Sequence, residues 1–209
     1  ASRDRRQRSI GVADGLVPAL QKRGHDVLAL TYMKNQLPSS FKVVKYKTPD
    51  KMTCSQPMAL SYAEHVERGL MAARGARALR DRHGYTPDVI FGHSGWGETL
   101  FLREVWPEAK LLVYAELLYR TRGQDVGFDA EFVRDLDWSR FSTTARNAHL
   151  AMGILQCDGA LAPTRYQAGS FPEELQSKIT VIHDGIDTDI MRPDPQASFT
   201  LPNGRTLRA

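Results

Sequence analysis

The sequence predicts an α/β domain in which a doubly wound parallel sheet is flanked by helices. Short apolar segments alternate along the chain with segments of helical periodicity, which is the pattern that βαβ units produce. The apolar segments are nearly continuous, as in parallel strands that are buried on both faces. A length of 209 residues with 42% hydrophobic and 25% charged residues suits one globular domain of this class and excludes a wholly disordered or disulfide-dependent chain.

The first third of the chain supplies one helix and two strands. A helix is predicted over 11–21, where apolar residues recur at helical spacing and Gly24 provides a stop. Strands are predicted at 27–30 and 41–47, because both are rich in apolar or β-branched residues and a Thr-Pro-Asp turn closes the second. The chain therefore begins with a helix where a doubly wound domain normally opens with a strand and its glycine-rich turn.

A long amphipathic helix is predicted over 61–82 and ends at Gly84. Its apolar stripe comprises Ala63, Val66, Leu70 and Ala73. A strand at 88–91 follows and leads into the glycine-rich run 92–99, after which another helix is expected.

The second half continues the alternation of strands and helices. A strand at 111–115 precedes an acidic stretch, and helices fill residues 129–156. A strand at 159–162 is followed by a Thr-x-x-Gln capping box that predicts one more helix. The last strand of the sheet is predicted at 179–182.

The two ends of the chain differ from its middle. Residues 1–10 form a basic tail, and a hairpin with Asn-Gly at its turn is predicted over 199–208. An isolated hairpin is marginally stable in water. We therefore expect residues 1–195 to form one domain and residues 196–209 to begin a following domain that is cut short.

Arginines gather in the N-terminal tail and on the long helix, although the net charge is only +4. The helical cluster comprises Arg68, Arg74, Arg77, Arg80 and Arg82. Such a cluster faces solvent or binds nucleic acid, an anionic membrane surface or a phosphorylated ligand. We expect the helix surface over 68–82 to make a peripheral contact with a membrane, and nucleic acid is not favoured.

The apolar runs are only a few residues long, whereas a membrane span needs roughly 18 or more. Cys54 and Cys157 lie far apart, without a CxxC motif or a nearby histidine pair, so no metal site is predicted. The basic N-terminus lacks the apolar core of a secretory signal. We expect a cytoplasmic protein, at the inner face of the membrane if the arginine helix touches it.

Ligands of doubly wound folds bind beyond the carboxyl ends of the strands. His93 and Glu116 each follow such a strand end and are the predicted catalytic residues, although a structural role is open for His93. The predicted binding residues are Ser94, Gly95, Trp96, Gly97, Arg120, Arg165, His183, Asp184 and Gly185.

Each group of binding residues has its own chemistry. The glycines near Trp96 let backbone N–H groups approach a phosphate or a sugar hydroxyl, or simply form a tight turn. Trp96 offers an apolar face for a sugar ring, or a place in the core. Arg120 and Arg165 are suited to a phosphate or carboxylate, or pair with the acidic stretch.

The run at 179–187, I-T-V-I-H-D-G-I-D, resembles the I-x-V-I-P-N-G-V-D segment that closes the N-terminal domain of family-4 glycosyltransferases of the GT-B fold. Residues 191–193 match the F-x-P that follows. Residues 16–27 resemble the first helix of that family and its exit, residues 87–90 its P-D-V-I strand, and residues 159–167 the helix entry after the next strand.

The resemblance implies the Rossmann-like N-terminal, acceptor-side half of a GT-B enzyme that transfers a sugar from a nucleotide sugar with retention and without a metal or other cofactor. The other half would hold the donor, so the 209-residue chain alone is expected to be inactive. Many members have a histidine where this chain has Glu116.

Two alternative functions stay open. One is a non-catalytic α/β module whose basic helix binds anionic lipid or nucleic acid, and the other is a GT-B hexosamine epimerase.

Overall fold

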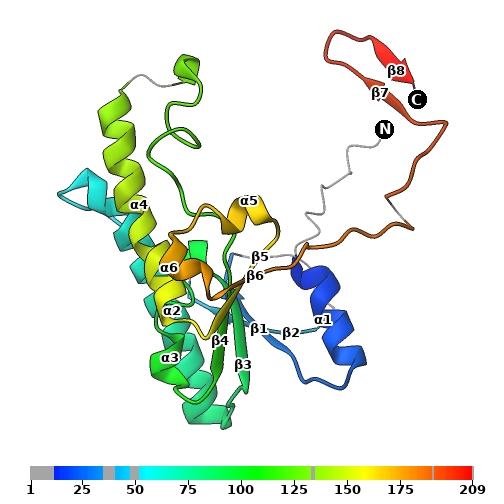
Figure 1. Ribbon diagram of the computed structural model, residues 1–209. Coiled ribbons are helices and arrows are strands. Elements are labelled where there is room, and N and C mark those ends of the chain that lie inside the picture. Colours follow the sequence, from blue (N-terminus) through cyan, green and yellow to red (C-terminus); the bar gives the residue numbers. More distant parts are fainter. Residues whose placement is uncertain (1–11, 35–40, 48–51, 133–134, 190, 209) are drawn as a thin grey trace.

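A computed structural model describes residues 12–34, 41–47, 52–132, 135–189 and 191–208 (Figure 1). Its helices are α1 (Val12–Lys22), α2 (Pro57–His83), α3 (Leu102–Val105), α4 (Leu136–Gln156), α5 (Arg165–Ala168) and α6 (Glu173–Gln176), with 3₁₀ turns η1 (Ser94–Trp96) and η2 (Ala130–Phe132). Its strands are β1 (Leu28–Tyr32), β2 (Lys42–Tyr46), β3 (Val89–His93), β4 (Lys110–Tyr114), β5 (Gly159–Ala162), β6 (Ile179–Val181), β7 (Ser198–Thr200) and β8 (Thr206–Arg208).

The central sheet has four parallel strands in the order β3-β4-β5-β6. In its register Val89 lies opposite Lys110 and His93 lies opposite Tyr114. Strands β1 and β2 also pair in parallel but form a sheet of their own, and β7 and β8 form an antiparallel hairpin. The predicted fold class is confirmed, because the chain is an α/β protein with a Rossmann-like parallel sheet flanked by helices.

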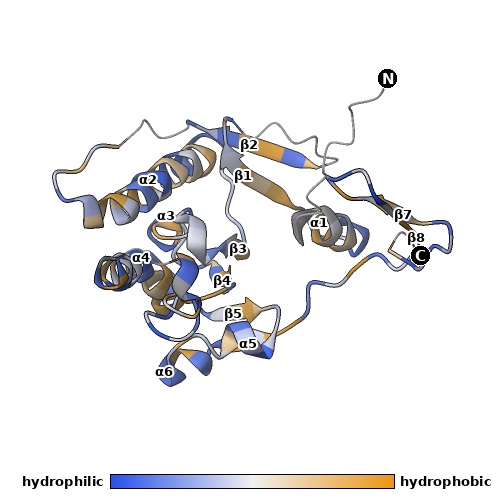
Figure 2. Cartoon of the chain, turned by 90° about the horizontal axis from the view of Figure 1, so that it is seen from above, coloured by the Kyte–Doolittle hydropathy of each residue, from blue (hydrophilic) through white to orange (hydrophobic). Residues whose placement is uncertain are grey.

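Helices α2, α3 and α4 cover one face of the four-stranded sheet, as the view from above shows (Figure 2). The core lies between these layers and is built from buried residues of β3, β4 and β5 with residues of α2 and α4. Representative members are Ile90, Leu111, Val113, Ala160, Ala76 and Ile154. On the face of β3 that these helices leave uncovered, Val89 and Phe91 are exposed.

The buried face of α2 agrees only partly with the predicted stripe, in which Ala73 is buried and Ala63 and Val66 are half-buried. Leu70, a member of that stripe, is 37% exposed. The fully or nearly buried positions comprise Gly69, Met71, Ala72, Ala73, Ala76 and Leu79. Hydrophobicity patterns miss this face because glycine and alanine carry little apolar surface, yet their small size lets neighbouring elements approach closely.

The other sequence predictions meet the structure with small differences. Helix α2 starts at Pro57, four residues before the predicted start, since proline fits the first turn of a helix. Of the helical residues predicted over 129–156, α4 begins only at Leu136, where the Asp135 side chain accepts a hydrogen bond from Trp138 N–H. The Thr164 cap of α5 and the C-terminal hairpin are confirmed.

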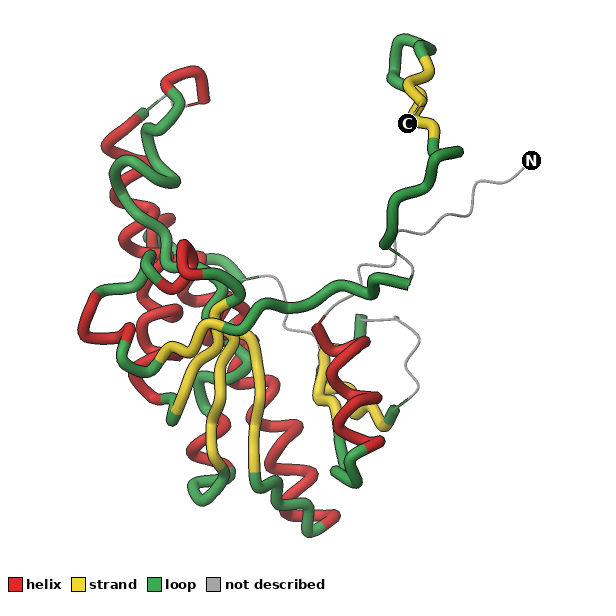
Figure 3. Tube along the Cα trace, turned by 45° about the vertical axis from the view of Figure 1, so that its right-hand side comes forward, coloured by secondary structure: helices red, strands yellow, loops and turns green. Residues whose placement is uncertain are grey.

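Two predicted features, the basic tail 1–10 and the Thr-Pro-Asp turn after β2, lie outside the described residues. After β6 the chain leaves the sheet as an extended segment and ends in the hairpin (Figure 3). The start of this segment, residues 183–185, lies near the carboxyl end of β4, as the contacts below show.

Candidate functional site

The carboxyl ends of β3 and β4 bring the two predicted catalytic residues together. His93 is the last residue of β3, and Glu116 follows β4 by two residues. Glu116 Oε2 lies 3.0 Å from Nε2 of His93. Nδ1 of His93 accepts a hydrogen bond of 2.9 Å from Gly95 N–H, so Nε2 carries the ring proton and donates to the carboxylate.

Two opposing effects set the pKa of His93. Burial lowers the pKa of His93, and the hydrogen bond and charge of Glu116 partly offset that effect. Glu116 itself is largely exposed to solvent. The site therefore presents a carboxylate, held by a neutral imidazole, that can accept a proton or a hydrogen bond from a hydroxyl group.

Tyr114 connects the pair to the loop after β6. Its hydroxyl donates a 2.8 Å hydrogen bond to Oδ2 of Asp184, and its ring lies 5.4 Å from the ring of His93. Burial and the neighbouring Asp184 raise the pKa of Tyr114. Beside Asp184, the Gly185 N–H donates to Nδ1 of His183 at 2.9 Å, which closes a small exposed turn.

The η1 turn follows His93 directly and packs next to it. Ser94 is buried, and its hydroxyl donates to the Tyr114 carbonyl at 3.1 Å, so this side chain joins the η1 turn to the end of β4. Trp96 is 53% exposed, and its ring lies 5.5 Å from that of His93. Gly97 has φ +89°, and a Cβ there would lie 2.3 Å from the His65 carbonyl oxygen, so only glycine fits.

Two stacked histidines, one on α2 and one on α4, lie against the η1 turn. The rings of His65 on α2 and His149 on α4 are 3.8 Å apart, and Nε2 of His149 donates to the Gly95 carbonyl at 3.2 Å. Burial, together with the nearby His65, lowers the pKa of His149 to about 4. His149 is therefore a neutral hydrogen-bond donor at physiological pH.

A second polar cluster lies next to Trp96. The Tyr46 hydroxyl donates a 2.9 Å hydrogen bond to Oε1 of Glu98, and Nη1 of Arg68 lies 4.0 Å from the same oxygen. The Arg68 guanidinium also lies 5.7 Å from the centre of the Trp96 ring and 5.9 Å from that of Tyr32. Burial raises the pKa of Glu98.

Neither of the two predicted binding arginines contacts the His93–Glu116 pair in the part of the chain that the structure describes. The Arg120 guanidinium donates to the Gly169 carbonyl, and its backbone N–H donates to Asp125. Arg165 is exposed at the start of α5, and no contact joins either arginine to His93 or Glu116 among the described residues. The structure thus gathers the predicted residues of β3, β4 and the loop after β6, but not these two.

The predicted basic surface of α2 is also divided. Arg68 faces the site, and the Arg80 guanidinium donates to the Val105 carbonyl at 2.9 Å and pairs with Asp81. Arg77 lies 3.9 Å from the other Asp81 oxygen. The arginines therefore do not form one uniform solvent-facing patch.

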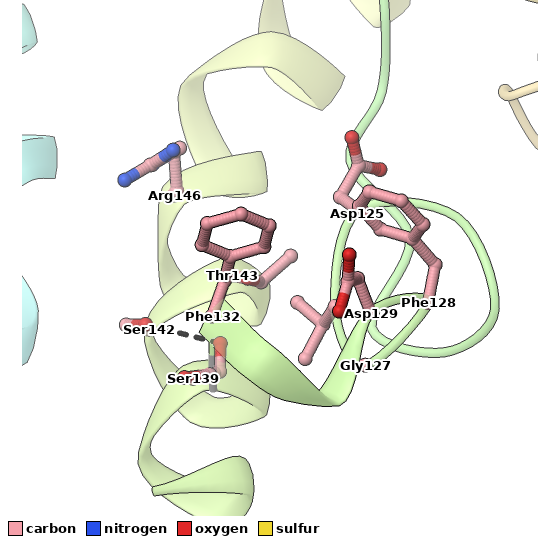
Figure 4. A pocket seen from close by; sticks show the side chains of 10 residues that line it. Asp125, Gly127, Phe128, Asp129, Phe132, Ser139, Ser142, Thr143 and Arg146 are labelled. Atoms are coloured by element: carbon pink, nitrogen blue, oxygen red, sulfur yellow. Dashed lines mark hydrogen bonds between the residues drawn. The ribbon is translucent and has the colours of Figure 1, made fainter. Parts of the chain in front are cut away.

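Two hollows lie away from the His93–Glu116 pair. One, of about 260 Å³, lies between the loop before η2 and helix α4 (Figure 4). It is lined by Asp125, Val126, Gly127, Phe128, Asp129, Phe132, Ser139, Ser142, Thr143 and Arg146. The other, of about 470 Å³, lies beside the chain that follows Glu116 and includes Arg120 and Arg122. Neither is lined by any residue of β3 or η1.

Sequence reasoning missed three residues that the structure places around the site. Tyr114 reads as an ordinary apolar strand residue, and Arg68 reads as one of several surface arginines. Glu98 lies within the glycine-rich run 92–99 that follows a strand, and this position is the signal that could have identified it. Across the part of the chain that the structure describes, no three His, Cys, Asp or Glu side chains form a metal-binding group, and no helix has the length and apolarity of a membrane span.

A family model described as the glycosyl transferase family 4 group matches residues 23–191. The chain belongs to this family. The matched part of this family 4 glycosyltransferase runs from the end of α1 to the segment after β6, so it includes every residue of the site described above. No curated protein matches the chain significantly.

Proposed function

We propose that this chain is the acceptor-side part of a retaining glycosyltransferase that moves a sugar from a nucleotide sugar to an acceptor hydroxyl. The hydrogen-bonded His93–Glu116 pair at the carboxyl ends of β3 and β4 carries the proposal. Family membership supports sugar transfer as the class of reaction. The pair supplies a solvent-accessible carboxylate at the edge of the sheet where such folds bind ligands.

In this proposal Glu116 receives the acceptor. Its carboxylate accepts the hydrogen bond of the acceptor hydroxyl and takes the proton as the oxygen bonds to the anomeric carbon, while the bond from that carbon to the nucleoside diphosphate breaks. The oxygen adds on the face from which the nucleoside diphosphate leaves, so the anomeric configuration is retained. His93 holds the carboxylate through Nε2, and Gly95 fixes the imidazole through Nδ1. The hydrogen bond from Tyr114 to Asp184 keeps the exposed segment 183–185 close to the carboxyl end of β4.

The donor is assigned mainly to a second Rossmann-like domain, because GT-B enzymes, which the sequence resembles, bind nucleotide sugar in their other half. No cofactor is required by this chemistry. We expect the 209-residue chain by itself to show neither sugar transfer nor donor hydrolysis. Both cysteines of the chain are free thiols, which suits the proposed cytoplasmic location.

The test is Glu116→Gln in the whole protein that carries this chain, with Glu108→Gln as the matched control at an exposed position after α3. Transfer is measured as glycoside formed from nucleotide sugar. Loss of a general base lowers kcat by about 100-fold or more, and the control stays within about twofold.

Two outcomes would overturn the proposal. One is transfer by the Glu116→Gln protein at the rate of the control. The other is a product that is an epimerised sugar rather than a glycoside, which would favour the hexosamine epimerase alternative.

A further inference from the structure

Arg68 is a fixed cation with open hydrogen-bonding capacity beside the candidate site. Its guanidinium lies between the rings of Tyr32 and Trp96, at 5.9 and 5.7 Å from their centres. Its side chain is 34% exposed. Among the described residues its nearest polar contact is Glu98 at 4.0 Å, which is too long for a hydrogen bond. The N–H groups of Arg68 are therefore available to a ligand.

The carboxylate nearest to Arg68 leaves the hydrogen-bond donors of the guanidinium unused. Glu98 is the one carboxylate paired with Arg68 in the described part of the chain, and its Oε1 already accepts a 2.9 Å hydrogen bond from Tyr46. Flanking rings hold a guanidinium by cation–π attraction without using its donors.

The position of Arg68 relative to the pair at His93 defines what could bind. Trp96 neighbours both, with its ring 5.7 Å from the Arg68 guanidinium and 5.5 Å from the His93 ring. The exposed part of Trp96 offers an apolar surface on which a sugar ring can lie. A ligand that spans this surface would place one end at Arg68 and another at Glu116.

We infer that Arg68 and Trp96 form a subsite for an acceptor sugar that carries an oxyanion, either a carboxylate or a phosphate group. The planar fork of the guanidinium matches two oxygens of such a group, and the indole contacts the ring. The inference rests on the proposed function, because it assigns the acceptor of that reaction to an anionic class.

Binding is measured in the whole protein by NMR, through the indole N–H signal of Trp96, with three probes: glucuronate, glucose 6-phosphate and neutral glucose. We expect an anionic probe to bind at least fivefold more tightly than glucose, and to weaken as salt is added. The probe that binds more tightly distinguishes a carboxylate from a phosphate ligand. Uridine diphosphate serves as a fourth probe, for the donor.

Arg68→Gln should reduce the affinity for the anionic probe to that for glucose, and Arg68→Lys should give an intermediate affinity because it keeps the charge without the fork. Arg77→Gln is the matched control on the same helix, and it should bind as the unaltered protein does. The thermal unfolding of each variant is compared first, so that a folding defect is not read as lost binding.

Equal affinities for glucose and the anionic sugars, or unchanged binding in Arg68→Gln, would overturn the inference. So would uridine diphosphate being the one probe that depends on Arg68, since the anion would then belong to the donor. These outcomes leave the Glu116→Gln test of sugar transfer unaffected. An enzyme that transfers sugar to neutral acceptors alone would refute the subsite and retain the proposed function.

Discussion

Glu116 and burial act in opposite directions on His93, and this opposition can be measured. Burial lowers the pKa of His93, while the hydrogen bond and charge of Glu116 raise it. Replacing Glu116 with glutamine removes the negative charge and leaves only the weaker hydrogen bond of a neutral amide oxygen. We therefore expect the pKa of His93 to fall further in Glu116→Gln and to stay unchanged in Glu108→Gln. NMR titration of the His93 ring protons checks this, and an unchanged or higher pKa in Glu116→Gln would contradict the geometry of the pair.

His149 links the site to the pH dependence of folding. Its pKa is about 4 in the folded chain against an ordinary 6.5, so the unfolded chain takes up the proton first. The contribution of neutral His149 to the free energy of unfolding is fully present above about pH 6.5, and it is lost as the pH falls toward 4.

His149→Gln isolates this contribution, because glutamine keeps an N–H donor for the Gly95 carbonyl but does not titrate. We expect the stability advantage of the unaltered chain over this variant to shrink by about 3 kcal/mol between pH 7 and pH 4. Urea unfolding at the two pH values measures the difference. An advantage that is the same at both would show that His149 is not held neutral.

At the scale of elements, the close approach of α2 to the η1 turn positions the site. Gly69 on α2 faces the Gly97 carbonyl, and a Cβ at Gly69 would lie 2.5 Å from that oxygen. The turn that carries Trp96 therefore rests directly on the helix backbone. Any side chain at Gly69 has to push the two elements apart, since the nearest atom belongs to the backbone.

Gly69→Ala tests this contact, with Gly15→Ala in α1 as the control, because nothing lies within 4 Å of a Cβ at Gly15. Alanine in an open helical position stabilises by about 0.5–1 kcal/mol relative to glycine. We expect that gain in Gly15→Ala and a loss of about 1–3 kcal/mol in Gly69→Ala. Denaturant unfolding measures both, and a stabilised Gly69→Ala chain would be inconsistent with the packing described.

The same helix shows where periodicity stops being informative. A hydrophobicity pattern locates α2 and its end at Gly84, but it assigns Leu70 to the core and leaves Gly69 unnoticed. The side of α2 that packs against its neighbours is the one with small side chains, and not the one with the largest apolar area. This rotation of the buried face is also why Arg68 faces the site instead of joining a basic surface.

For the whole molecule, the order of elements follows from local signals, and the pairing of distant strands does not. Alternating apolar and helical segments predict an α/β fold with a parallel sheet, and the strand-end rule places His93 and Glu116 together. The same rule does not predict whether Arg120 and Arg165 contact this pair, because it fixes the edge of the sheet but not the course of each loop. The separation of β1 and β2 from the other strands likewise depends on long-range contacts that no short segment encodes.

That separation has a consequence for the exchange of backbone protons with deuterated solvent. Within the described sheet β4 and β5 are paired on both sides, whereas β3 is paired only with β4. In a parallel ladder alternate N–H groups point to opposite neighbours, so half of those in β3 point away from β4.

We expect β3 to show fast and slow amides in alternation, and β4 and β5 to be protected throughout. Mass spectrometry with residue-level fragmentation, or NMR, reads this pattern directly. Uniformly slow exchange along β3 would mean that another strand covers its free edge in solution. The exchange pattern of five residues, Val89 to His93, thus reports whether the sheet ends at β3 or continues beyond it.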